Sequence, residues 1–125
     1  MRAAALLDRA REFLAAATHA GGAAPGVAIE NAHSAAELTV QAQMLVQQTE
    51  TRSHQVRREW LDAWAHHQNT PQHHADVLWN LADLRERASY GSDKLPLKPG
   101  SLTKILNTVQ EMIDLTAARL NQDRR

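Results

Sequence analysis

The sequence predicts an all-α fold: an up-and-down bundle of four to five helices that forms a single domain over residues 1–125. Three observations predict it. The chain is rich in Ala, Leu, Gln, Glu and Arg, which favour helices. No segment shows the alternating pattern of a strand. Apolar residues recur at helical spacing in five segments separated by Gly, Pro and capping residues.

The first two helices are separated by the segment "GGAAPG". We expect the first helix from about Arg2 to Ala20, ended by the paired glycines and by Pro25. Its apolar face is Leu6, Ala10, Phe13, Leu14 and Ala17. The second helix is expected over about residues 27–50. It carries two apolar stripes, which predicts a central position in the bundle.

The remaining three helices have recognisable starts. The third follows Ser53, a good N-cap, and ends near His67. The fourth starts at Thr70 and Pro71 and continues toward Gly91. The last runs from the cap at Ser101 to about residue 121. The predicted buried positions are Val56, Trp60, Leu61 and Trp64 in the third helix and Leu102, Ile105, Leu106, Val109, Met112, Ile113, Thr116 and Leu120 in the last.

Composition excludes several kinds of site. The chain has no cysteine, so disulfides, thiolate zinc sites, iron–sulfur clusters and a cysteine nucleophile are excluded. Fourteen basic and fourteen acidic residues predict no bulk attraction to nucleic acid or to a membrane. Charged residues interrupt the apolar N-terminal stretch, so we expect no signal peptide, no membrane span and a cytoplasmic location.

Four of the seven histidines lie in "HHQNTPQHH", residues 66–74. No two histidines are three or four apart, the spacing at which one helix chelates an ion. We therefore predict no metal site and no cofactor, with His66, His67, His73 and His74 at a solvated corner between helices. Adsorption of zinc or nickel across the turn stays an alternative. A single Glu-x-x-His, Glu30 to His33, is too little for a di-iron site.

Several segments together resemble the HEPN superfamily, small helical domains of prokaryotic toxin–antitoxin, defence and RNA-processing systems. These segments are "RAREFLAAA", "AHSAAELTVQAQML", the pair Ser53-His54 and "LRERASYG". The last resembles the Arg-x-x-Ala-Asp-Tyr pattern of one branch, with Ser89 in place of Asp. The resemblance covers nearly the whole chain. It implies a helical bundle, a homodimer and a nucleotidyltransferase antitoxin partner that modifies a tyrosine, here Tyr90.

The resemblance also implies a site. Ribonuclease members carry Arg-x(4–6)-His in a cleft between protomers, and Arg85 matches the arginine while Tyr90 stands where histidine is expected. No other Arg-x(4–6)-His exists in the chain. Metal-independent RNA cleavage needs a base near neutrality, and tyrosine has an ordinary pKa of about 10. We therefore expect a non-catalytic or weakly catalytic member that associates with RNA.

Two alternatives stay open. One is an active metal-independent endoribonuclease that uses Arg85 with Tyr90 or His54. The other is a purely structural bundle, in which Arg85 only pairs with Glu30, Glu37 or Asp83. The residues predicted to contact nucleic acid are Arg52, Arg57, Arg58 and Arg87, although a solvated helix face would explain the first three equally well. Trp60, Trp64 and Trp79 could stack on bases but are expected in the core or in dimer contacts.

Overall fold

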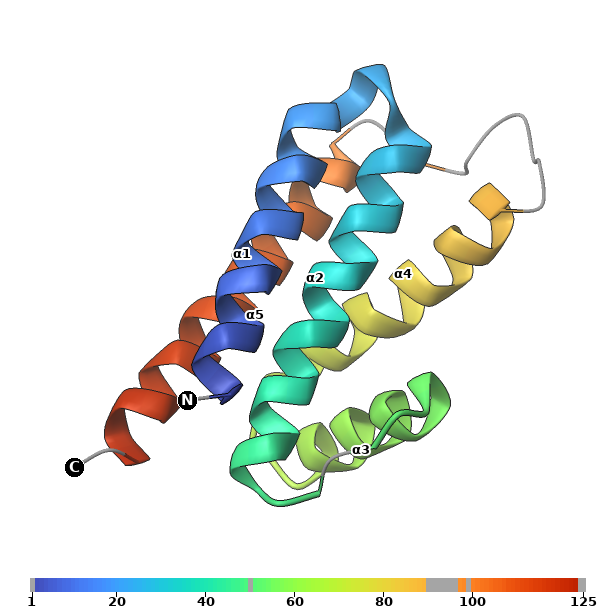
Figure 1. The fold of residues 1–125 in the computed structure, drawn as a ribbon. Coiled ribbons are helices and arrows are strands. Elements are labelled where there is room, and N and C mark those ends of the chain that lie inside the picture. The colour runs from blue at the N-terminus through green and yellow to red at the C-terminus, as the bar shows by residue number, and fades with distance from the viewer. Residues whose placement is uncertain (1, 50, 90–96, 99, 124–125) are drawn as a thin grey trace.

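The computed structural model describes residues 2–49, 51–89, 97, 98 and 100–123, and these residues are almost entirely helical. The elements are α1 (Arg2–Ala20), a short 3-10 helix η1 (Gly21–Ala23), α2 (Pro25–Val46), α3 (His54–His66), α4 (Gln72–Ser89) and α5 (Ser101–Asp123) (Figure 1). No strand occurs in the described part of the chain, which confirms the all-α prediction. Within that same part, no helix is both long and apolar enough to span a membrane.

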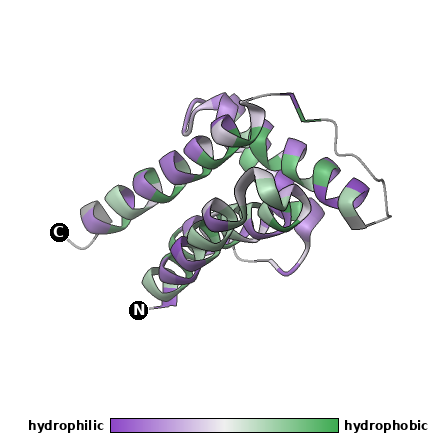
Figure 2. Ribbon diagram, turned by 90° about the horizontal axis from the view of Figure 1, so that it is seen from above, coloured by the Kyte–Doolittle hydropathy of each residue, from purple (hydrophilic) through white to green (hydrophobic). Residues whose placement is uncertain are grey.

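The helices α1, α2, α4 and α5 form the bundle, and α3 lies across one end of it. The helices α1 and α2 run antiparallel, α5 packs against both of them, and α4 packs against α2 and α5 (Figure 1). The short helix α3 runs crosswise beside the start of α4 and also contacts α2. Each helix carries hydrophilic and hydrophobic residues (Figure 2), as expected when one face is buried.

The boundaries of α2 differ from the prediction. The helix begins at Pro25, two residues earlier than predicted, because a proline in the first turn loses no helical hydrogen bond. The helix ends at Val46, four residues early. There Gln48 adopts a positive φ of 58°, and the Thr49 amide donates to the Met44 carbonyl at 2.9 Å, which closes the last turn.

The start of α3 is as predicted, but its buried face agrees with the prediction only at Leu61. The Ser53 Oγ accepts a hydrogen bond from the Val56 amide at 3.2 Å and caps the helix. The buried residues of α3 are Arg57, Leu61 and Ala65. Val56 is exposed, and Trp60 and Trp64 stack on each other at 4.8 Å, only partly buried against the core. The helical spacing was predicted correctly, but the face of α3 that points inward is the one with Arg57, Leu61 and Ala65. On this face Arg57 pairs with the buried Glu37.

The core lies around α2, as its two apolar stripes predicted. Ile29, Leu78, Leu81 and Ile113 are among its fully buried side chains. Alanines buried along α2 let the neighbouring helices approach closely: Ala28, Ala32, Ala35, Ala36 and Ala42. In α1 the buried face includes Leu7 instead of the predicted Leu6, which is partly buried. The apolar interior consists of a large cluster around α2 and a smaller one of Ala3, Leu7, Ala42 and Leu120. A charged residue buried on α2 beside them needs a specific partner.

Candidate polar site around Glu37

Glu37 is a charged residue buried in the interior of the bundle. It lies on α2 with a side chain only 6% exposed. Arg57 of α3 donates from Nε to Glu37 Oε2 at 2.5 Å, and the arginine side chain is 4% exposed. A second donor, Arg57 Nη1, reaches the Thr51 carbonyl at 2.8 Å. This buried ion pair fixes the start of α3 to the middle of α2.

Two histidines flank the same carboxylate. His33, one helical turn before Glu37, places Nε2 3.3 Å from Glu37 Oε1, yet this buried nitrogen forms no hydrogen bond. His54 of α3 places Nδ1 3.0 Å from that oxygen and 2.7 Å from Arg57 Nη2. A ring nitrogen cannot donate to Glu37 and accept from Arg57 at once. The His54 tautomer therefore decides which of the two contacts is a hydrogen bond.

The carboxyl of Glu37 is ionised at neutral pH. Burial by itself raises its pKa, but the contact with His33 and the hydrogen bond and charge of Arg57 outweigh burial and lower the pKa to about 2. The carboxylate thus offsets the buried charge of Arg57.

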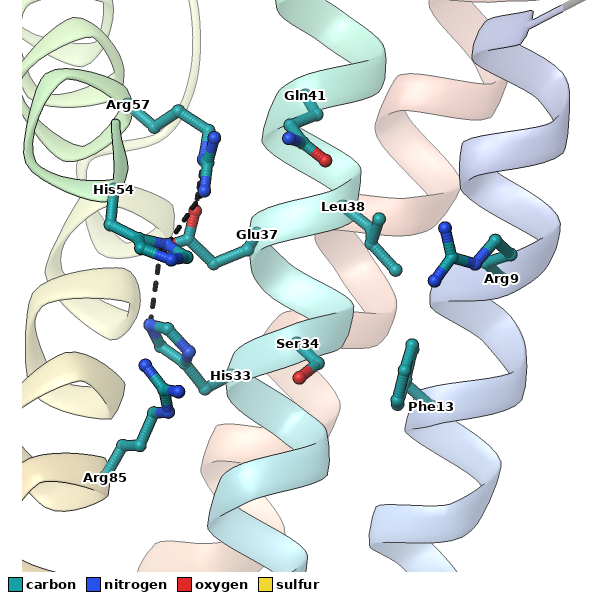
Figure 3. Close-up of a pocket in the computed structure, with 10 residues that line it drawn as sticks. All are labelled: Arg9, Phe13, His33, Ser34, Glu37, Leu38, Gln41, His54, Arg57 and Arg85. Atoms are coloured by element: carbon teal, nitrogen blue, oxygen red, sulfur yellow. Dashed lines mark hydrogen bonds and ion pairs between the residues drawn. The ribbon is translucent and has the colours of Figure 1, made fainter. Parts of the chain in front are cut away.

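An open cavity of about 250 Å³ lies over this cluster, between α1, α2, α3 and α4 (Figure 3). Its lining side chains are Arg9, Phe13, His33, Ser34, Glu37, Leu38, Gln41, His54, Arg57 and Arg85. Arg85 reaches it from α4, 43% exposed, with Nε donating to Glu30 Oε1 at 2.8 Å. Of the three carboxylates expected to pair with Arg85, Glu30 is the partner found. The cavity therefore combines three guanidinium groups and two imidazoles with one buried carboxylate.

The predicted site residues are only partly brought together. Arg85, His54 and Arg57 line the cavity, whereas Tyr90 lies outside the residues that the structure describes. Arg58 instead covers the ring of the exposed Trp79, 4.9 Å from its centroid. Arg52, Arg57 and Arg58 thus lie in different surroundings and do not line one groove. Arg87 of α4 pairs with Asp83 at 3.1 Å, and neither it nor Arg52 lines the cavity.

Three titratable residues of the cavity were not predicted as site residues: Arg9, His33 and Glu37. A signal for two of them existed. His33 and Glu37 are four apart, so they share a face of a helix whose faces are otherwise largely apolar. A charged residue at such a position is expected to have a buried partner. Arg9 carries no comparable signal, because one arginine on an amphipathic helix is ordinary.

The histidine corner is also only partly as expected. His66 and His67 are exposed, as predicted. His74 is buried, so its prediction as a solvated residue was wrong. The Nε2 atoms of His73 and His74 lie 2.8 and 3.3 Å from the same oxygen of Glu111 on α5. The segment 66–74 is therefore exposed as predicted except at Thr70 and His74, and His74 is buried where α4 meets Glu111 of α5.

Known proteins add nothing to this geometry. No family model, no curated protein and no solved structure matches the chain.

The low pKa of Glu37 predicts loss of stability in acid. Because the folded-state pKa of about 2 lies below the ordinary value of 4.5, the unfolded chain binds the proton more readily. The stabilisation is complete above pH 4.5 and is lost as the pH falls toward 2. Its full size is about 3 kcal/mol. Urea unfolding between pH 6 and pH 3 should show Glu37→Gln losing less stability than the wild type. The control variant Glu12→Gln, at an exposed position, should lose as much stability as the wild type over this pH range. An equally large loss in Glu37→Gln would contradict this prediction.

Proposed function

We propose that this protein is a HEPN-like, RNA-associated domain of the toxin–antitoxin or defence type, and that it holds an RNA phosphate in the cavity over Glu37. One observation supports this most: Arg85 and His54, distant in sequence, line the same cavity. The resemblance to the superfamily supplies RNA as the ligand. It also supplies the expectation of a homodimer and of a nucleotidyltransferase partner, which light scattering and co-purification test.

The charges of the cavity suit a phosphate. Glu37 already offsets Arg57. Among the described residues Arg85 pairs with Glu30, in a contact where both side chains are more than 40% exposed. Such exposed pairs contribute little to stability, so Glu30 can give way to a stronger ligand. A guanidinium binds phosphate oxygens in a bidentate manner. Arg9 adds a further cation from α1.

The contacts of His54 favour weak catalysis at most. If Nδ1–H donates to Glu37, the half-exposed imidazole keeps a free Nε2 lone pair that can accept the proton of a ribose hydroxyl. If Nδ1 instead accepts from Arg57, the proton sits on Nε2 and the base is lost. The two tautomers compete for one carboxylate and one guanidinium. RNA binding with slow or absent cleavage is the expected result.

The test uses single-stranded RNA at low salt in EDTA. We expect Arg85→Ala to weaken binding by about tenfold or more, since a charge-assisted contact is lost. Arg11→Ala is the matched control. Arg11 is also about half exposed and paired with one carboxylate, Asp8, but it lies outside the cavity. Binding by Arg85→Ala equal to that of the wild type would overturn the proposal.

A second candidate is an active endoribonuclease that uses Arg85 with His54. The favouring observation is the contact of His54 Nδ1 with a buried carboxylate, an arrangement that orients a general base. It predicts rapid cleavage in EDTA that is lost in both Arg85→Ala and His54→Ala. RNA binding without cleavage would exclude the active endoribonuclease and agree with the non-catalytic RNA-binding domain.

A further inference from the structure

His73, His74 and Glu111 form a cluster at the first turn of α4, near the opposite end of that helix from Arg85. Each offers one ligand atom, and these three atoms all lie within 4.8 Å of one another. The two histidines come from the first turn of α4, and Glu111 comes from the middle of α5. Their imidazoles meet edge to face, with ring centroids 4.6 Å apart. Two imidazoles and a carboxylate therefore converge from two helices.

The positions of His73 and His74 on α4 do not by themselves predict a shared ligand site. Neighbouring residues on a helix point about 100° apart, so His73 and His74 alone do not chelate. Glu111 lies between the two directions, and both Nε2 atoms reach the same Oε2 atom, at 2.8 and 3.3 Å. His74 is 4% exposed and therefore held in place, while the other two side chains are more than half exposed. The cluster thus combines one fixed ligand with two that are open to solvent.

We propose that His73 Nε2, His74 Nε2 and a Glu111 carboxylate oxygen bind a Zn²⁺ ion. Imidazole and carboxylate ligands at about 2.0–2.2 Å are typical of zinc, and three protein ligands leave a fourth position for water. Ligand atoms of a tetrahedral site at these bond lengths are about 3.3 Å apart. The observed separations are close enough that small rotations of the exposed His73 and Glu111 complete the geometry.

The protonation states suit a metal. Burial lowers the pKa of His74, partly opposed by its contact with Glu111, and the charges of His73 and Arg119 lower it further. Contacts from both histidines lower the pKa of Glu111. A neutral imidazole and an ionised carboxylate are the forms that coordinate zinc. Arg119 is a nearby cation that opposes a dication. Its guanidinium lies over the Trp64 ring, 4.6 Å from the centroid, and donates to the Asn69 carbonyl, which hold it in place.

A bound ion would cross-link the start of α4 to α5. Among the described residues, the two histidines contact α5 through the carboxylate of Glu111. Ligand binding to the folded state alone raises stability with metal concentration. Zinc would therefore stabilise the helix that also carries Arg85, without entering the RNA cavity.

The experiment uses tag-free protein, stripped with EDTA and titrated with ZnCl₂ by calorimetry. We expect the wild type to bind about one Zn²⁺ per chain and to melt several degrees higher with zinc. His73→Gln and Glu111→Gln should each weaken binding by about tenfold or more. Both side chains are more than half exposed, so both variants should fold. His67→Gln, an exposed histidine outside the cluster, should bind zinc like the wild type.

Three results would overturn the proposal: no stoichiometric binding by the wild type, wild-type affinity in Glu111→Gln, or an equal loss in His67→Gln. The last would indicate adsorption at the exposed histidines. The RNA assay is performed in EDTA, so failure of the zinc site and failure of the RNA proposal are separate outcomes.

Discussion

Replacing Arg57 with alanine is expected to destabilise the protein by about 3–5 kcal/mol at neutral pH, because it leaves the buried Glu37 carboxylate without its guanidinium. The Thr51 carbonyl loses a donor in the same variant. Chemical unfolding at pH 7 measures this loss. Far-UV circular dichroism shows whether the remaining helices stay folded.

Two controls make the origin of the loss clear. Arg52→Ala removes an exposed arginine nearby and should change stability by no more than about 0.5 kcal/mol. The double variant Arg57→Ala with Glu37→Gln should lose less than the sum of the two single variants, because the uncompensated charge is gone. Additive losses would mean that the pair does not interact as described.

Leu81→Ala is expected to cost about 2–5 kcal/mol. Leu81 is fully buried in the core cluster where α4 meets the rest of the bundle, and alanine would leave a cavity as well as remove apolar burial. The free energy of unfolding from urea titration measures the effect. Leu81→Met, which keeps the volume, should cost less than about 1.5 kcal/mol.

The matched control is Val56→Ala on α3. Val56 is 45% exposed, so its truncation should change stability by no more than about 0.5 kcal/mol. An equal loss at Val56 and Leu81 would contradict the expectation that burial decides the cost at Leu81.

Helix positions could be predicted because their signals are local. The bounds of α1 and the cap of α3 at Ser53 follow from residues within one or two turns. The buried face of α3 was predicted only in part: Leu61 is buried, but Val56 is exposed and Trp60 and Trp64 are partly buried. The buried position of Arg57 depends on its partner Glu37, which lies on α2.

The candidate site was harder to predict because its residues come from four helices. Arg85 and His54 were both named from the sequence, but no local pattern indicates that they share a cavity. His33 and Glu37 carried a usable signal, a polar pair on a buried face. The cluster of His73, His74 and Glu111 joins residues nearly 40 positions apart, so spacing along one helix argued against it.

The sequence by itself determined the helical class, the start of most helices and the central place of α2, because propensity, caps and periodicity act over a few residues. Tertiary structure alone decided which polar groups meet. A buried carboxylate needs a cation, and the packing of α3 across the end of the bundle brings Arg57 and His54 to Glu37. The same packing principle sets Glu111 between two histidines whose directions on α4 differ, since α5 supplies the contact that α4 cannot make with itself.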